Sequence, residues 1–247
     1  MLEVKFFKDY RKNIKFDLKK IYNQIKTAKS MDFNYLIEAS AVYSSSIEGN
    51  SMDLNSFMNS KGLKTKPKEL KEIISLTNTY KFAQTHALNE KNFLLAHAML
   101  SQDFLIKTNQ GKYRKEKIGV FSSVGLVYMA VEPEKVSEEI KQLFLEIKRL
   151  LKKDLSIYEV FYYASLIHLQ IAQIHPFFDG NGRIARLLEK WFIAQKLDKR
   201  AWIIQSEKFY KDNLKKYYQN INLGPNYYEL KQEKSIPFLL MLAESLK

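Results

Sequence analysis

An apolar segment at residues 157–174 constrains the fold of this chain more than any other part of its sequence. It reads IYEVFYYASLIHLQIAQI, with apolar residues on nearly every side of a helical wheel. Such a pattern predicts a helix that is buried in the middle of the fold. Pro176 follows directly after His175 and ends this helix, because proline cannot continue its hydrogen-bonding pattern.

Other segments carry the spacing of helices with one apolar face. These are residues 136–151 and 183–196, together with residues 68–80, which follow Pro67, a residue favoured at a helix start. Residues 118–131 differ, since they are rich in β-branched and aromatic residues and are interrupted by turn formers near Ser122 to Gly125. That pattern predicts a β-hairpin. We therefore expect an all-α fold with one small β-hairpin near residues 118–131.

The domain organisation predicted from the sequence is one compact unit with three parts. Residues 1–66 form N-terminal helices, residues 67–200 the core, and residues 201–247 C-terminal helices that pack on the core, with a linker at residues 62–67. A chain of 247 residues with 46% hydrophobic content is typical of a soluble globular protein with a substantial core. His97 and His168 fall on helical segments and are expected to be packed core histidines.

Composition excludes several classes of protein. The chain has no cysteine, which excludes disulfides and thiolate metal sites. It lacks a signal-peptide core, and its longest apolar runs are too short to span a bilayer, so we expect a cytoplasmic protein without a membrane partner. The net charge of +13 is scattered in small clusters rather than in one basic arm. Such a surface could attract acidic partners or reflect a lysine-rich proteome, and we do not expect nucleic acid as a partner.

The segment after the buried helix carries the chemistry. Residues 175–186 read HPFFDGNGRIAR and lead into the N-terminus of the next helix, where unpaired N–H groups and the helix dipole favour an anion. Gly180 and Gly182 let these N–H groups approach a phosphate closely. Arg183 and Arg186 lie one turn apart and could each grip a further phosphate. The segment therefore predicts a site for a nucleoside triphosphate.

Two further side chains of this segment suggest a reaction. Asp179 is surrounded by positive potential, and a carboxylate there is best explained by a cation such as Mg²⁺ that bridges phosphate oxygens. His175 closes the preceding helix at its negative end, where the dipole raises the basicity of imidazole, and it is placed to act as a general base. The alternative is a structural turn with a satisfied histidine. A structural turn has no use for one Asp and two Arg that converge on two glycines.

The segment resembles the signature of the Fic family, H-x-F-x-[D/E]-G-N-G-R-x-x-R. The specified positions match at His175, Phe177, Asp179, Gly180, Asn181, Gly182, Arg183 and Arg186. Proteins with this motif mostly transfer AMP from ATP to a Ser, Thr or Tyr hydroxyl of a protein. Related Doc toxins, which transfer a phosphoryl group, carry Lys where this chain has Gly182, and this difference favours nucleotidyl transfer.

The resemblance implies a role for each residue of the motif. His175 would deprotonate the target hydroxyl and Asp179 would hold Mg²⁺. The backbone from Gly180 to Gly182, together with Asn181, would form an anion hole. Arg183 would bind a phosphate of the leaving group, Arg186 would bind the γ-phosphate, and Phe177 would anchor the loop in the core.

A second motif lies far upstream, at the end of a helical pattern over residues 33–47. Gly49 is a natural helix stop, which leaves Glu48 in the last turn, where the dipole disfavours an anion by roughly 0.3 to 1 kcal/mol. A carboxylate in such a position suggests a cationic partner elsewhere, and Ser44 on the same face could steady it. The alternative is an ordinary exposed Glu near a helix end.

Ser44, Glu48 and Gly49 match [S/T]-x-x-x-E-[G/N], the pattern of the inhibitory helix of Fic proteins. By that resemblance Glu48 pairs with Arg186 and takes the place of the γ-phosphate, so that ATP binds only in an unproductive pose.

The predicted hairpin also has a counterpart in this family, the flap beside the active site. By resemblance, Ile118, Val120, Leu126 and Tyr128 would dock the target segment as an added strand. The alternative is a small hairpin that only covers the core. Tyr217 and Tyr218 resemble a tyrosine pair found close to the adenine pocket of Fic proteins, with packing aromatics as the alternative.

These observations predict a protein adenylyltransferase that is held largely inactive by Glu48. Its substrates would be ATP and a hydroxyl of a target protein or of the chain itself. Its cofactor would be Mg²⁺, and the chain could form a homo-oligomer. Two alternatives remain open: removal of AMP, with Glu48 positioning water, and a basic nucleic-acid-binding module whose chemistry is idle.

Overall fold

The computed structural model describes residues 2, 4–25, 30–122 and 125–247. The first half of the chain forms α1 (Phe7–Asn13), α2 (Leu18–Gln24), α3 (Ser30–Ile47), α4 (Leu54–Ser60), α5 (Lys68–Thr85) and α6 (Glu90–Ser101). A hairpin of β1 (Gly119–Ser122) and β2 (Gly125–Met129) follows. The second half forms α7 (Pro133–Lys152), α8 (Ile157–Ile174), α9 (Asn181–Lys196), η1 (Lys199–Ile203), α10 (Ser206–Asp212), α11 (Leu214–Ile221), η2 (Gln232–Lys234) and α12 (Ile236–Glu244). The predicted class, mainly helical with one small hairpin, is confirmed.

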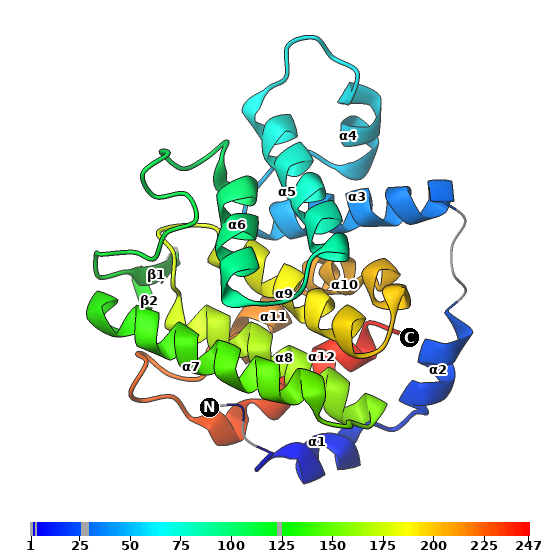
Figure 1. The fold of residues 1–247 in the computed structure, drawn as a ribbon, viewed down its shortest axis with the longest axis vertical. Helices are drawn as coiled ribbons and strands as arrows, with labels where there is room; N and C mark the ends of the chain where they lie inside the picture. Colours follow the sequence, from blue (N-terminus) through cyan, green and yellow to red (C-terminus); the bar gives the residue numbers. More distant parts are fainter. Residues whose placement is uncertain (1, 3, 26–29, 123–124) are drawn as a thin grey trace.

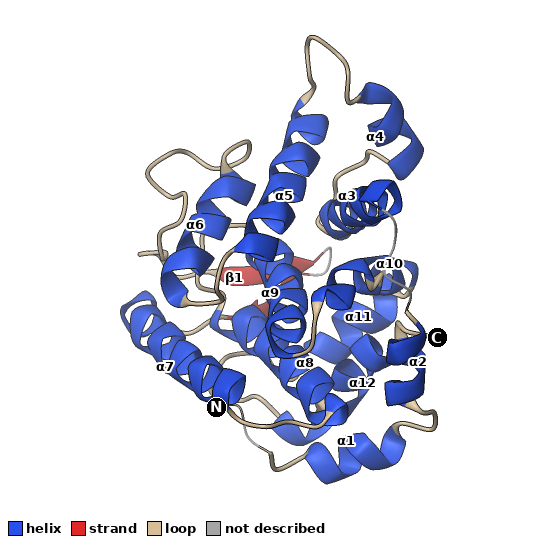
Figure 2. Ribbon diagram, turned by 45° about the vertical axis from the view of Figure 1, so that its right-hand side comes forward, coloured by secondary structure: helices blue, strands red, loops and turns tan. Residues whose placement is uncertain are grey.

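Helix α8 is the centre of the fold, as its apolar pattern predicts. It contacts α7, α9 and α12 as well as the two N-terminal helices, and both ribbon views show it between α7 and α12 (Figures 1 and 2). The helix begins at a capping box in which Ser156 and Glu159 satisfy each other's backbone N–H groups. From Val160 to Ile171 every side chain is buried. The end of α8 is therefore held rigidly in the core, and the loop to α9 starts from a fixed point.

Helix α3 brings the upstream motif to the core. It packs against α5, α9 and α10, so its C-terminal end lies beside the beginning of α9. Helix α4 and the start of α5 project from the rest of the molecule (Figure 1). Residues 62–67, the predicted linker, connect these two helices. The packing of α3 is what places a motif near residue 48 next to one near residue 182.

The hairpin is antiparallel and lies beside the end of α8. Gly119 pairs with Met129 and Val120 with Tyr128, and a register shift follows Val120. Met129 also forms a bridge with Asn226 from the C-terminal segment, so β2 is covered on its second side near its end. Part of the turn predicted at residues 122–125 lies outside the described residues.

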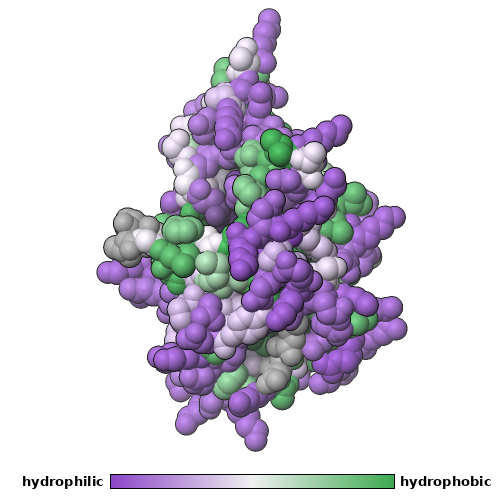
Figure 3. Space-filling view, turned by 90° about the vertical axis from the view of Figure 1, so that its left-hand side faces the viewer, coloured by the Kyte–Doolittle hydropathy of each residue, from purple (hydrophilic) through white to green (hydrophobic). Residues whose placement is uncertain are grey.

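The surface in Figure 3 is mostly hydrophilic with small apolar patches. Among the helices that the structure describes, none has the length and apolar character that crossing a membrane requires.

Candidate functional site

The site is built at the loop that joins α8 to α9. His175 is the C-cap of α8 and adopts a left-handed backbone with φ 51°, the only described residue other than glycine with a positive φ. Such a conformation costs a residue with a side chain roughly 1–2 kcal/mol, so the surroundings must hold it. Arg114 does so, because its Nε donates to the carbonyl of His175 (2.7 Å) and its backbone N–H to that of Pro176 (3.0 Å). The sequence analysis did not identify Arg114 as part of the site.

The second half of the loop is held by Asn181 and Phe177. The side chain of Asn181 accepts from the backbone N–H of Phe177 (2.9 Å) and donates to its carbonyl (2.8 Å). Phe177 is buried, which fits its predicted role as an anchor. The amide of Asn181 therefore shapes the loop, and what it can offer an anion is its backbone N–H at the start of α9. This refines the expectation that Asn181 contributes to an anion hole.

His97 supports the same loop from α6. Its ring stacks on Phe177 at 3.5 Å between centroids, its Nδ1 accepts from the N–H of Gly111 (3.0 Å), and its Nε2 lies 2.9 Å from the carbonyl of Asp179. These partners define a neutral imidazole with the proton on Nε2. Burial lowers the pKa of His97 to about 4. The expected core histidine is confirmed as buried, but its contact with the motif was not predicted, because periodicity says nothing about partners 82 residues away.

The start of α9 carries the residues that the sequence predicts to bind an anion. Gly180 is the N-cap residue with φ 86°, a left-handed conformation that favours glycine. The side chain of Asp179 is half exposed at 51% and accepts from Nη2 of Arg183 (3.2 Å). A single accessible carboxylate next to a phosphate site fits Mg²⁺, which usually takes one or two carboxylates and completes its shell with phosphate and water oxygens.

Arg183 is held on several sides. Besides Asp179, Oε2 of Glu72 lies 3.7 Å from its Nη1, and its guanidinium stacks on the ring of Phe104 at 3.8 Å. Its Nε is buried without a hydrogen-bond partner among the described residues. A buried donor without a partner costs free energy, so this arginine is ready to bind an acceptor such as a phosphate oxygen.

Arg186 is fully buried and binds the upstream motif. Its Nη2 donates to Oε1 of Glu48 (2.7 Å) and to the carbonyl of Ser44 (2.9 Å), and its Nε donates to the hydroxyl of Ser44 (2.9 Å). Burial by itself would raise the pKa of Glu48, but the charge of Arg186 outweighs it and the pKa lies below its usual value. Glu48 is therefore ionised. The two motifs that sequence analysis singled out meet in one ion pair.

Glu48 also covers the start of α9. A Cβ atom added to Gly182 would overlap Oε1 of Glu48, so only glycine fits beneath this carboxylate. Gly49, with φ 93° in the turn after α3, lets the chain reverse directly behind Glu48. The carboxylate thus lies against the backbone that would receive a phosphate.

The base candidate differs from expectation in one respect. The helix-dipole argument predicted a raised basicity for His175, whereas its pKa lies below the usual value, because burial disfavours the charged imidazole more than the Ala172 carbonyl, Glu48 and Asp179 favour it. Its Nδ1 lies 3.2 Å from the carbonyl of Ala172, which places the proton on Nδ1 and leaves Nε2 as an acceptor. A neutral imidazole with a free Nε2 is the form that a general base needs.

A buried hydrogen-bond chain extends behind Arg186. Its Nη1 donates to the hydroxyl of Tyr217 (3.2 Å), which lies 2.9 Å from Nε2 of His168, and Nδ1 of His168 lies 2.8 Å from Glu189. Tyr210 donates to the same carboxylate (2.9 Å). Sequence analysis recognised the tyrosine pair only by resemblance and gave His168 no partner. Tyr218, the other member, donates to the carbonyl of Ile47 at the end of α3 (2.9 Å).

The flap candidates divide into two groups. Leu126 is exposed at 52%, while Ile118 and Val120 are half-buried. Tyr128 is buried and donates to the carbonyl of Gln173 in α8 (2.8 Å), so its side chain fastens the hairpin to the core and is not exposed for docking. Phe121, which was not selected, is exposed at 71%.

These features define a helical protein with a glycine- and arginine-containing junction between two core helices. Residues 80–193 match the model of the Fic/DOC family. No curated protein matches the chain.

Solved structures of Fic proteins share the fold. A Fic family protein from Desulfovibrio desulfuricans G20 aligns with a TM-score of 0.72 and 21% identity over 98% of this chain and 70% of the other. A Fic domain containing signaling protein from Bacteroides thetaiotaomicron VPI-5482 aligns with a TM-score of 0.67 and 21% identity over 93% of this chain and 92% of the other. Fic-1 (residues 134–508) from C. elegans aligns with a TM-score of 0.63 and 18% identity over 98% of this chain and 68% of the other. At these identities the likeness concerns the fold.

Proposed function

We propose that this protein transfers AMP from ATP to a hydroxyl of a protein and that Glu48 holds it in an inactive state. The observation that carries the proposal is the ion pair between Glu48 and Arg186, which lies directly over Gly182. Gly182 and Arg186 belong to the start of α9, and Glu48 reaches them from the end of α3. The geometry supports a triphosphate site in which one of the two arginines, Arg186, is already paired with a carboxylate.

The described side chains support a transfer step in which each has a proposed role. The target oxygen would attack the α-phosphorus of ATP while the bond to the oxygen that bridges the α- and β-phosphates breaks, and pyrophosphate would leave. His175 would take the hydroxyl proton on Nε2. The backbone N–H groups of Asn181 and Gly182 and the guanidinium of Arg183 would stabilise the negative charge that develops on the phosphates, whereas the N–H of Gly180 donates to Oδ1 of Asp179. Mg²⁺, held by Asp179, would neutralise further phosphate charge when bound.

Glu48 would oppose this step in two ways. Its carboxylate occupies the guanidinium that would otherwise bind the γ-phosphate, and its negative charge faces the backbone donors of α9. The triphosphate would have to bind in a different pose, with its α-phosphorus away from His175. Removing the carboxylate should restore the productive pose.

The target segment would bind at the hairpin. Among the described residues β1 pairs with β2 alone, whereas β2 is also bridged by Asn226. The outer edge of β1 is therefore open for an added strand, with the exposed Phe121 and Leu126 beside it.

The experiment compares four purified proteins for transfer of label from α-labelled ATP: wild type, Glu48→Gly, His175→Ala and the double variant. We expect weak labelling by wild type, strong labelling by Glu48→Gly and none by the double variant. If the double variant labels as well as Glu48→Gly, His175 is not the base. A γ-labelled ATP control reports phosphoryl transfer, which we do not expect.

A second candidate is the reverse reaction, removal of AMP from a modified hydroxyl. It is favoured by one observation, namely that the charge of Glu48 acts on His175 and raises its pKa against the effect of burial. Both groups therefore belong to one electrostatic environment, in which Glu48 would position the water and His175 would exchange its proton. Release of AMP from a modified target, present in wild type and lost in Glu48→Gly, would support this direction.

A further inference from the structure

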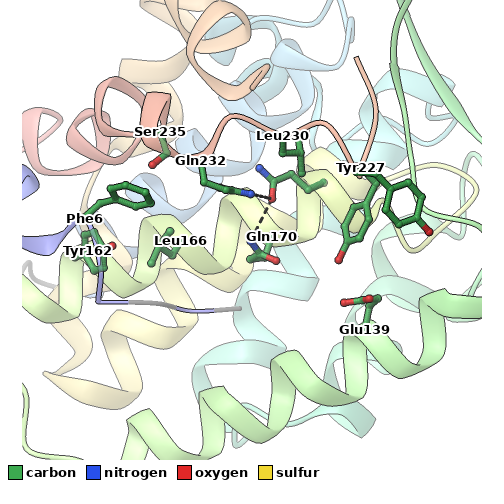
Figure 4. A pocket seen from close by; sticks show the side chains of 11 residues that line it. Phe6, Glu139, Tyr162, Leu166, Gln170, Tyr227, Leu230, Gln232 and Ser235 are labelled. Atoms are coloured by element: carbon green, nitrogen blue, oxygen red, sulfur yellow. Dashed lines mark hydrogen bonds between the residues drawn. The ribbon is translucent and has the colours of Figure 1, made fainter. Parts of the chain in front are cut away.

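A cavity of about 460 Å³ lies beside α8. One stripe of this helix lines it, through Tyr162, Leu166, Gln170 and Gln173, and the C-terminal segment from Tyr227 to Ser235 covers it. Figure 4 shows aromatic side chains at its two ends, Phe6 and Tyr162 at one and Tyr227 at the other, with the amides of Gln170 and Gln232 between them. Cavities of this size hold small organic ligands.

The amides at its centre are incompletely paired. Gln170 and Gln232 both donate to Oε1 of Gln173, at 3.1 and 3.4 Å. Within the part of the chain that the structure describes, the Nε2 of Gln173 has no partner, although the residue is only 3% exposed. The hydroxyl of Ser235, 1% exposed, also has none. Two buried polar atoms in one cavity each cost free energy unless a bound molecule satisfies them.

The lining restricts the charge of that molecule. Gln173 offers an N–H donor, so the ligand must bring an acceptor, which a simple ammonium ion lacks. Among the described residues no Lys or Arg lines the cavity, and the one charged residue of this lining is Glu139, which already shares a hydrogen bond with Tyr227. A phosphate or carboxylate would be repelled and left without a counter-charge. The ligand is therefore neutral and carries carbonyl or ring-nitrogen acceptors.

We propose that this cavity binds a neutral nucleobase or nucleoside. Glutamine amides offer the paired donor and acceptor that match the edge of a base, and aromatic side chains at both ends can stack on its flat faces. The same reasoning excludes an intact nucleotide. The site is separate from the junction of α8 and α9, and its occupancy does not depend on the proposed AMP transfer.

Its walls are attached to the hairpin. Met129 of β2 donates to the carbonyl of Pro225 (2.9 Å) and accepts from the N–H of Tyr227 (3.1 Å), while the carbonyl of Gln173 accepts from Tyr128. A ligand that orders this wall should therefore slow hydrogen exchange at the amides of Met129 and Tyr227.

The test uses uracil and its 6-carboxylate, orotate, as a matched neutral and anionic pair, with adenosine as a larger neutral probe. Binding to the full chain is measured by calorimetry with and without saturating ATP. We expect saturable binding of uracil or adenosine that persists in ATP, weaker binding of orotate by at least about tenfold, and slower exchange at Met129 and Tyr227.

The variants locate the site. Gln173→Met removes the unpaired donor at similar volume, together with the oxygen that accepts from Gln170 and Gln232. It should weaken binding about tenfold, as expected for one lost hydrogen bond of roughly 1.4 kcal/mol. Gln84→Met is the matched control, because Nε2 of Gln84 is also buried without a partner but lies in α5, away from the cavity. Ser235→Ala provides a second cavity variant should Gln173→Met fold poorly, and it should also weaken binding.

Three results of the calorimetry with the wild-type chain would overturn the proposal. They are the absence of saturable binding of any neutral probe at millimolar concentration, equal binding of uracil and orotate, and loss of binding in the presence of ATP. Unchanged affinity in a folded Gln173→Met protein, or unchanged exchange at Met129 and Tyr227, would place the ligand elsewhere and would overturn it equally.

Discussion

Glu48 lies so close to the backbone of Gly182 that no residue with a Cβ atom fits at position 182 while the carboxylate stays in place. The two residues are far apart in sequence and share no local element. Position 182 lies in the first turn of α9. Its glycine therefore combines two demands, room for the Glu48 carboxylate and close access to the backbone N–H groups.

This relationship predicts that the effect of Gly182→Ala on the free energy of unfolding has opposite signs in wild type and in a Glu48→Gly protein. In a Glu48→Gly protein the substitution should stabilise the fold by about 0.5–1 kcal/mol, because alanine is the better helix former. In wild type it should destabilise by about 1–3 kcal/mol, because the added methyl group forces Glu48 off Arg186. Urea unfolding of wild type, Gly182→Ala, Glu48→Gly and the double variant measures these changes in the free energy of unfolding. An equal effect of Gly182→Ala in both backgrounds would contradict the contact between Glu48 and Gly182.

Arg186 should stay in place when Glu48 is removed, because Ser44 and Tyr217 also hold it. In the Glu48→Gly background, Tyr217→Phe should therefore raise the KM for ATP by about tenfold, since it leaves a buried charged donor without its acceptor at a cost of roughly 1.5–3 kcal/mol. Tyr218→Phe is the matched control, because its hydroxyl binds Ile47 and not Arg186. Similar KM values for the two variants would show that Tyr217 does not position Arg186.

The left-handed backbone of His175 predicts a stability difference between two inactive variants. His175→Gly and His175→Ala both remove the imidazole, but glycine adopts φ 51° without the Cβ clash. We expect the glycine variant to be more stable by about 1 kcal/mol. Thermal or urea unfolding measures this. An alanine variant at least as stable as the glycine variant would mean that the loop relaxes once the ring is gone.

The low pKa of His97 predicts acid sensitivity of the loop. The folded state keeps this imidazole neutral down to a pH of about 4, whereas the unfolded chain protonates it near 6.5. The unfolded state binds more protons between these values, so the contribution of His97 to stability is full above about pH 6.5 and is lost as the pH falls towards 4. The loss should reach about 3 kcal/mol.

Unfolding free energies of wild type and His97→Phe at several pH values test this. The advantage of wild type should shrink between pH 7 and pH 4. An NMR titration of the His97 ring that gives a midpoint near 6.5 in the folded protein would exclude the mechanism.

The parts of the fold that sequence patterns predicted are those with local causes. The bounds of α8 agree with the apolar segment because burial on all sides shows in the composition of that segment alone. The hairpin was predicted because β-branched residues and turn formers are neighbours in the chain. The beginning of α9 at the glycines was predicted because phosphate-binding turns have a local signature.

Predictions about environment were less accurate. The dipole argument for His175 concerned one helix and left out the burial that lowers its pKa. Asn181 was assigned to the anion, whereas its side chain binds Phe177 within the same loop. Arg114, His97 and His168 were not assigned contacts with the site, because each touches it through a partner more than 30 residues away.

The sequence alone determined the residue types of the site, the helix that carries them and the glycines that open it, since these depend on the chemistry and conformation of consecutive residues. It also suggested, through the unfavourable place of Glu48 at a helix end, that this carboxylate has a distant cationic partner. The resemblance to Fic proteins named Arg186 as this partner, but it is the packing of α3 against α5, α9 and α10 that brings Glu48 to Arg186, which is buried and backed by Tyr217. Proximity between segments separated by more than 130 residues is a property of the packed core, and no local pattern encodes it.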